Sequence, residues 1–296
     1  MKQKIVLLAV LFMSTLSYAQ FEISASTGYA LGSAGMQLGE TITTSGTENY
    51  YGSYGNGANV QIRGTYFFND TFGADLAFGY LHGDDQTISE VNTPMRQTDA
   101  VARARAFGAS ASIVYKFTNN IYGRFGALIK VGGKTEAVVN DKNYYAVDPS
   151  AENPQGVTVS QAFGLPERSY SETDYVEDYH GQFPLGFVGA LGYKFDLGNN
   201  FGLFVEAEYY GISLKRKDSE FVEFNTDIKT ADGTVVAAGV YTLDNLPDGF
   251  NKKTTYVDEL SHTESDPSKK LSEKVPYSSF GLNFGITYKF NSAPKQ

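Results

Sequence analysis

The segment from Ser278 to Phe290 alternates strictly between large apolar residues and small or polar ones. Because successive side chains of a β-strand point to opposite faces, this spacing predicts a strand with one apolar and one polar face. Its aromatic ending recurs along the chain, at Tyr66-Phe67-Phe68, Tyr115-Lys116-Phe117, Tyr193-Lys194-Phe195 and Tyr288-Lys289-Phe290. Aromatic residues gathered at one end of several strands are typical of a transmembrane β-barrel, where they lie at the membrane boundary.

Spaced by this repeat, the sequence predicts eight strands. They cover about 21–30, 58–68, 71–81, 101–117, 121–131, 182–195, 201–214 and 275–290. Short connections rich in Asn, Asp and Gly (69–70, 118–120, 196–200) alternate with long ones (31–57, 82–100, 132–181, 215–274). We therefore expect an all-β fold: an eight-stranded antiparallel transmembrane β-barrel with short periplasmic turns and long extracellular loops. In the fourth long loop, residues 234–236 and 240–242 flank Ala237-Ala238-Gly239 and predict a hairpin above the membrane.

The N-terminus predicts a cleaved secretory signal peptide. Lys2 and Lys4 precede an apolar run from Ile5 to Leu16, and small residues stand before Gln20. That run is shorter than a membrane-spanning helix requires. We expect a signal peptide at 1–19, the barrel at 20–290, a short periplasmic tail at 291–296, and localisation in the cell outer membrane.

Composition narrows the classes of function. The chain has no Cys, 31 Gly, and 21 each of Tyr and Phe, which favours strands and turns and excludes disulfides. A net charge of -9 argues against a nucleic-acid partner. No glycine-rich phosphate loop, zinc pattern or hydrolase elbow occurs, so we expect no cofactor and no metal. The acidic third loop could bind a divalent cation through its carboxylates, but it lacks calcium-loop spacing.

The polar faces of the predicted strands carry charged residues. An eight-stranded barrel is narrow enough for side chains to fill it, and buried charges are costly unless they are paired. A network of ion pairs in the lumen is therefore expected from Arg63, Asp75, Arg124, Glu206 and Glu208. The alternative is a soluble barrel in which these charges face water.

Two arginines of the fourth strand belong to its other face. The register places Arg103 and Arg105 outward, about 12 residues above Phe117 and near the far edge of the apolar band. Contact with lipid phosphates is one interpretation. A β-bulge that turns both arginines inward is the other.

With these features the chain resembles the small outer-membrane barrels of Gram-negative bacteria, of the OmpA transmembrane-domain and OmpX kind. The Ala19-Gln20 junction and the Tyr-Lys-Phe strand ends resemble the Bacteroidetes members. The resemblance implies recognition of the last strand by the barrel-assembly machinery, with Tyr288 and Phe290 as the matching positions, although residues 291–296 extend beyond the terminal Phe. It also implies contact with outer-membrane lipids or lipopolysaccharide.

We expect a non-enzymatic outer-membrane protein that serves envelope integrity or surface recognition, with an extracellular ligand bound by the long loops. The alternatives are a rim enzyme, either lipid A-modifying or an omptin-like protease, and a small-molecule conduit. Asp178 and His180 have the Asp-x-His spacing of omptins, and His82 with Ser89 could form a deacylase pair. A charged, filled lumen disfavours the conduit.

Overall fold

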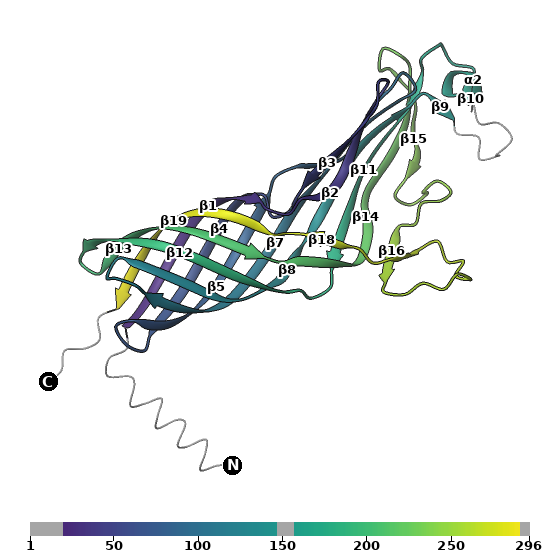
Figure 1. Ribbon diagram of the computed structural model, residues 1–296. Helices are drawn as coiled ribbons and strands as arrows, with labels where there is room; N and C mark the ends of the chain where they lie inside the picture. The colour runs from purple at the N-terminus through teal and green to yellow at the C-terminus, as the bar shows by residue number, and fades with distance from the viewer. Residues whose placement is uncertain (1–19, 147–156, 291–296) are drawn as a thin grey trace.

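The computed structural model describes residues 20–146 and 157–290, and the expected signal peptide and C-terminal tail lie outside them. Eight antiparallel strands form a closed barrel (Figure 1). In spatial order they are β1 (Gln20–Gly32), β4 (Gly57–Phe67), β5 (Phe72–Gly83), β7 (Arg96–Lys116), β8 (Ile121–Asn143), β12 (Leu185–Gly198), β13 (Phe201–Gly211) and β19 (Ser279–Phe290). The barrel closes where β19 pairs with β1, from Phe21 opposite Phe290 to Gly32 opposite Ser279.

Three short turns connect barrel strands at one end. In the first, the Asn69 side chain accepts hydrogen bonds from the backbone amides of Thr71 and Phe72 at 2.9 and 2.7 Å. In the last, Asn199 and Asn200 both have positive φ, at 51° and 70°. Asparagine tolerates this conformation, which matches the twist of a two-residue hairpin.

The barrel is apolar outside and polar inside. Leu76 and Phe125 point outward with 69% and 65% of their surface exposed, whereas Glu206 and Arg124 point inward with 1% and 3%. A soluble protein has the opposite arrangement, because exposed apolar surface and buried charge both cost free energy in water. The expected eight-stranded transmembrane β-barrel is therefore present, and the soluble alternative is wrong.

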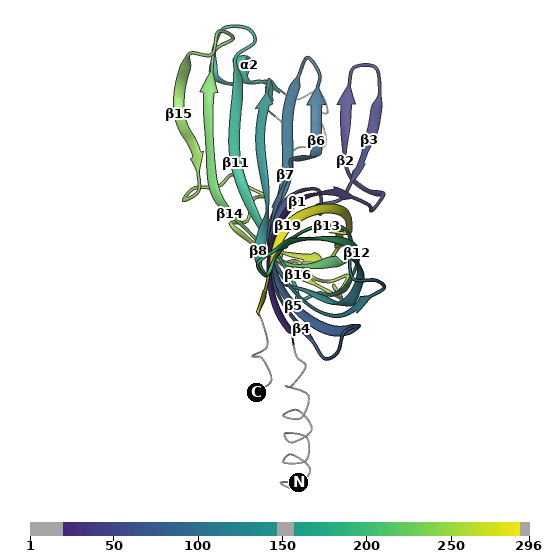
Figure 2. The ribbon, with the colours of Figure 1, turned by 90° about the vertical axis from the view of Figure 1, so that its left-hand side faces the viewer.

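Most residues of the long connections form a second structure, the upper sheet, above the open end of the barrel (Figure 1). Its strands are β3 (Thr47–Gly52), β2 (Met36–Thr43), β6 (Gln86–Asn92), β11 (Tyr170–Gly181), β14 (Ser213–Lys229), β15 (Val235–Thr242) and β16 (Lys253–Val257), with the upper halves of β7 and β8 between β6 and β11. Figure 2 shows β15, β14, β11, β7, β6, β2 and β3 side by side above the barrel, whereas β16 lies lower, beside the start of β14.

Small elements complete the fold. They are β9 (Tyr145–Ala146), β10 (Val157–Thr158), α2 (Val159–Phe163), β17 (Lys269–Leu271) and β18 (Lys274–Pro276). Thr158 and Gln161 form a capping box at the start of α2, and Gly164 with φ of 63° ends it. Within the described residues, no helix is both long and apolar enough to cross a membrane.

The strands β7 and β8 belong to both the barrel and the upper sheet. They pair along their whole length, with one irregularity between Phe107 and Gly108. Strand β7 pairs with β5 as far as Arg105, and β8 pairs with β12 as far as Ile129; above these residues their partners are β6 and β11. Gly133, with φ of 91°, lies beside this irregularity, where a Cβ atom would overlap the Arg105 carbonyl. The upper sheet is therefore a continuation of the barrel wall.

The expectation for the long connections is wrong in two respects. They are largely β-structure: β8, for example, runs to Asn143 and not to Val131. The expected turn at 237–239 lies inside β15, which pairs along β14, and the chain reverses at 230–234 instead. Gly239 forms a bulge there, because its amide donates to the Asp227 side chain at 2.9 Å.

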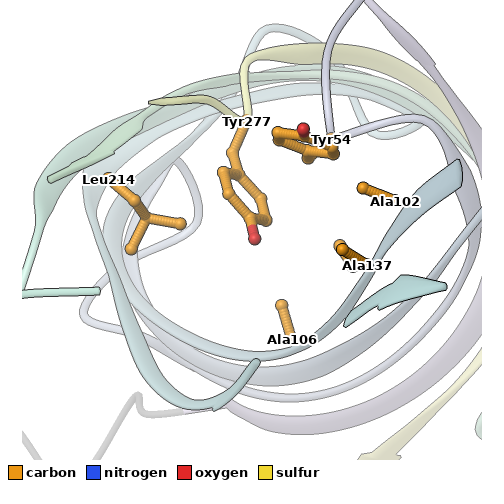
Figure 3. Close-up of a cluster of buried hydrophobic side chains, with 7 residues drawn as sticks. Tyr54, Ala102, Ala106, Ala137, Leu214 and Tyr277 are labelled. Atoms are coloured by element: carbon orange, nitrogen blue, oxygen red, sulfur yellow. The ribbon is translucent and has the colours of Figure 1, made fainter. Parts of the chain in front are cut away.

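An apolar cluster covers the barrel where the upper sheet begins. Figure 3 shows Tyr54, Tyr277 and Leu214 pointing into the ring of strands, with Ala106 and Ala137 on the opposite wall. The rings of Tyr54 and Tyr277 lie 5.8 Å apart, and the Tyr277 hydroxyl contacts Thr135. This cluster narrows the upper mouth of the barrel.

A closed barrel predicts a folded form that resists SDS, because its spanning strands pair all their backbone groups internally. Purified protein should therefore migrate differently on a denaturing gel before and after boiling. Gly28→Val should abolish the unboiled band, because a Cβ at Gly28 overlaps the Asn283 side chain and the Leu282 carbonyl across the β1–β19 seam. Gly35→Val is the control, since nothing lies within 4 Å of its Cβ position. Identical migration of the boiled and unboiled wild type would contradict the closed barrel.

Candidate functional site

The lumen contains a buried charge network centred on Glu206. The Arg63 guanidinium donates two hydrogen bonds to its carboxylate, at 3.1 and 3.0 Å. Arg124 donates two more, at 3.2 and 3.0 Å, and the Tyr122 hydroxyl another at 2.7 Å. These donors come from β8, two strands from β13 around the barrel, and from β4, three strands from it on the other side, so the network reaches across the lumen.

Glu208 extends the network by one step along β13. It contacts the Arg124 guanidinium, and it accepts hydrogen bonds from Tyr210 Oη at 2.5 Å and from Asn283 Nδ2 at 2.6 Å. Asp75 lies on the other side, 3.9 Å from Arg63 Nε. The structure thus gathers all five residues that the sequence places in the lumen. Three acids against two arginines leave the network acidic by one formal charge.

Several lumen partners lie outside the set of five residues predicted from the sequence. Tyr122, Tyr210 and Asn283 each donate to a network carboxylate. Alternation could have identified them, because each lies an even number of residues from an inward-facing residue of its own strand and so shares strand parity with it. Nearer the short turns, Lys194 contacts the buried Glu22. Paired polar side chains therefore occupy the lower barrel.

Arg103 and Arg105 lie on the face of β7 that continues the outside of the barrel. They share strand parity with the exposed Phe107, while Ala104 and Ala106 face the opposite way and are buried. Arg103 Nε lies 3.2 Å and Arg105 Nε 3.8 Å from Glu136, and Arg103 also lies 3.5 Å from Asp85. The arginines are thus outward-facing and partly neutralised. Their contact with lipid phosphates stays a prediction.

The same outer face of the upper sheet carries further cross-strand ion pairs. Glu172 on β11 contacts Lys229 on β14, lies 3.5 Å from Lys142 on β8, and accepts a hydrogen bond from Asn140 at 2.9 Å. Burial alone would raise the pKa of the Glu172 carboxyl, but the bonds from Lys229 and Asn140 and the Lys142 charge hold it below its ordinary value. These contacts tie three neighbouring strands together.

The two candidate catalytic pairs have other partners. Asp178 accepts a hydrogen bond from Lys134 at 2.8 Å, and His180 Nδ1 lies 2.8 Å from Asp218. Among the described residues no hydrogen bond joins Asp178 to His180, or His82 to Ser89. No grouping of three or more His, Asp or Glu side chains in this part of the chain could hold a metal ion.

Strand β15 at the edge of the upper sheet differs from the paired charged face. Its sequence, VVAAGVYT, has no charged residue, and Val235, Val236 and Tyr241 are 47%, 48% and 38% exposed. Its described strand pairing is with β14 alone, so its other backbone edge is open. An uncharged, exposed edge strand is a site to which another chain can bind.

No protein-family model and no curated protein matches the sequence. Among solved structures, the chain is similar to Ail, the attachment invasion locus protein of Yersinia pestis, with 11% identity and a TM-score of 0.36 over 92% of this chain and 99% of that one. A major outer membrane protein from Thermus thermophilus has 11% identity and a TM-score of 0.37, over 92% of this chain and 99% of that one. The outer membrane protein OprG from Pseudomonas aeruginosa has 12% identity and a TM-score of 0.32, over 93% of this chain and 98% of that one. These scores are low, so the fold assignment rests on this chain's own strand pairing.

Removal of one cation should destabilise the lumen strongly. Arg124→Met leaves Glu206 and Glu208 buried with too few partners, which we expect to cost about 3–5 kcal/mol of unfolding free energy. Arg103→Met, on a partly exposed arginine, should cost about 1 kcal/mol or less. The measurement is the urea dependence of the unboiled gel band. An Arg124→Met midpoint equal to that of the wild type would show that the network contributes nothing to stability.

Acid should loosen the upper sheet before the barrel. Because the folded-state pKa of Glu172 is lowered, its stabilisation is complete above the unfolded value of about 4.3 and is lost as pH falls through the folded value. Hydrogen exchange of β11 amides, corrected for intrinsic rates, should therefore accelerate about fivefold at low pH, the equivalent of about 1 kcal/mol. Glu172→Gln should show a smaller acid effect, and Glu223→Gln, at an exposed position, should respond like the wild type. Equal acid responses of wild type and Glu172→Gln would refute this role.

Proposed function

We propose that this protein is a non-enzymatic outer-membrane barrel that displays the upper sheet outside the cell to bind a protein partner. The observation that carries the proposal is the direct continuation of β7 and β8 from the barrel wall into the upper sheet. A sheet held in this way keeps a fixed orientation above the membrane. Such preorganisation reduces the entropy lost when a partner binds.

The contact strand that we propose is β15. It combines exposed apolar side chains with an open backbone edge, whereas the outer face of β7, β8, β11 and β14 carries ion pairs such as Arg103 with Glu136 and Lys229 with Glu172. An extended segment of a partner can add to such an edge through main-chain hydrogen bonds. Residues of β15 would then supply apolar contact, and the charged face would keep the remaining surface soluble.

The aromatic side chains of the barrel support an orientation with the upper sheet outside the cell. Aromatic side chains cluster at the lower end of the barrel, with Phe21 and Phe290 rings 5.6 Å apart and Phe201 and Tyr288 rings 4.9 Å apart. We propose that this end faces the periplasm, after cleavage of the 1–19 signal peptide and assembly guided by Tyr288 and Phe290. Arg103 and Arg105 would then lie at the outer leaflet, within reach of lipid or lipopolysaccharide phosphates. The Tyr-Lys-Phe strand ends support assignment to the Bacteroidetes type of OmpA/OmpX-like barrels.

Absence of catalysis belongs to the proposal. Asp178 and His180, the residues that motivate a rim enzyme, each pair with a different side chain. A conduit is also disfavoured, because the Glu206 network fills the lumen. A role in envelope integrity would require the barrel alone and not the upper sheet.

One set of cells tests the proposal. Cells that lack the gene are complemented with the wild type, with Val236→Lys, or with a variant in which a Gly-Ser turn replaces residues 217–272. That turn would join Arg216 and Glu273, whose backbone N and O atoms lie 3.0 Å apart. We expect both variants to restore bile-salt resistance and to lose adhesion to plates coated with extracellular protein.

Val222→Lys is the matched control, because Val222 is an exposed apolar residue of the same sheet, 40% accessible, on β14. It should leave adhesion unchanged. The unboiled gel band reports that each variant is folded. Full adhesion of the Val236→Lys cells would reject β15 as the contact strand, and full adhesion of the turn variant would reject residues 217–272 as the contact region.

A further inference from the structure

Two adjoining cavities lie between the Glu206 network and the upper mouth of the barrel. The lower one, of about 110 Å³, is lined inside the barrel by Ala77, Gly79, Gly108 and Leu128. The upper one, of about 80 Å³, is lined by residues of the upper sheet that include Leu38, Ile88 and Arg216. Lys130, Leu214 and Tyr277 line both, so the two cavities adjoin at these side chains, and together they are called the chamber here.

Lys130 is the cation of this chamber. It shares strand parity with the inward-facing Arg124 and Leu128 of β8. Its ammonium lies 5.3 Å from the centre of the Tyr277 ring. No aspartate or glutamate stands among the described residues that line the cavities, and no ion pair of Lys130 occurs in the described chain. The nearest lysine along the strand is different, because Lys134 pairs with both Glu136 and Asp178.

A partly buried ammonium without a carboxylate costs free energy that a bound anion would recover. The network acids below cannot serve, since Glu206 and Glu208 are held by Arg63 and Arg124. The Tyr277 ring contributes only a cation–π contact. The chamber therefore presents positive charge to its interior.

The remaining wall of the lower cavity is mostly apolar, with polar side chains such as Gln61 and Ser110, and it has room. Gly79 of β5 is paired with Gly108 of β7, so two adjacent side chains are missing from the inner wall. A Cβ at Gly108 would find no atom closer than 3.6 Å. An apolar cavity of about 150 Å³ holds benzene in another protein. The chamber is of that order, and it has a cation at its centre.

We propose that this chamber binds a small organic anion: a carboxylate at Lys130 joined to an apolar body the size of a benzene ring above Gly79 and Gly108. The ligand enters and leaves through the upper cavity, because the Arg124 and Glu208 contacts close the lumen below. The barrel is then a receptor for this anion and not a passage. Arg216, 3.4 Å from the exposed Glu273, adds a second cation near the entrance.

The test uses the full-length mature protein in lipid nanodiscs and calorimetric titration with sodium benzoate, with benzyl alcohol as its uncharged counterpart and empty nanodiscs as the reference. We expect benzoate to bind, and benzyl alcohol to bind about tenfold more weakly or less, because the charged hydrogen bond to Lys130 is missing. Lys130→Met should weaken benzoate about tenfold and leave benzyl alcohol unchanged, while Lys130→Arg keeps benzoate binding.

Two further variants separate the pocket from its charge. Gly108→Val fills the lower cavity and should abolish binding of both compounds. Lys217→Met removes a lysine that is 66% exposed outside the chamber and should change nothing. Each variant is first shown to be folded by its unboiled gel band. Absence of benzoate heat in the wild type, unchanged affinity in Lys130→Met, or retained binding in Gly108→Val would each overturn the proposal.

Discussion

Closure of the backbone hydrogen-bond ring is the constraint on which the rest of the structure depends. In hydrocarbon an unpaired N–H or C=O costs several kcal/mol, so a spanning sheet has to return to its first strand. Here β19 returns to β1 over twelve residue pairs, from Phe21 and Phe290 to Gly32 and Ser279. The ring in turn fixes which side chains are inside. The lumen is a consequence of closure, and its charges are tolerated only because they meet across it.

The same pairing rule has a different outcome above the barrel. Beyond Arg105 on β7 and Ile129 on β8 the partners of these strands change, and the ring opens into a sheet with free edges. In water an open edge is permitted, but it invites association unless charges or bulges protect it. The outer face has such charges, in pairs such as Arg103 with Glu136. Strand β15 has a bulge at Gly239 but no charge. Its exposure is therefore an exception within its own sheet.

The sequence predicts the barrel well because two independent signals coincide there. Strict alternation identifies the faces, and the aromatic endings identify the strand ends, so these patterns suffice to assign Arg63 and Glu206 to one lumen. Above the membrane neither signal holds. Both faces of β11 contain polar or aromatic residues, as in Asp174 and Tyr175, because one face meets water and the other meets Phe221 and Phe224. Alternation is then lost from the sequence although the strand is present.

The chamber could not be found from the sequence, because it depends on which residues of other strands lie beside Lys130. Lys130 follows the same alternation as Arg124, and by parity alone it is one more lumen charge. Lys130 differs from Arg124 in its position along the barrel axis. The acids of β13 end at Glu208, and above them the wall of β5 and β7 contains Gly79 opposite Gly108. Tyr277, which covers it, comes from the segment before β19, whose position depends on the backbone bond from Tyr277 to Ile212 at 3.1 Å. A lysine becomes unpaired through the absence of neighbours from three other strands, and such an absence is a property of the three-dimensional fold and not of the strand that contains the lysine.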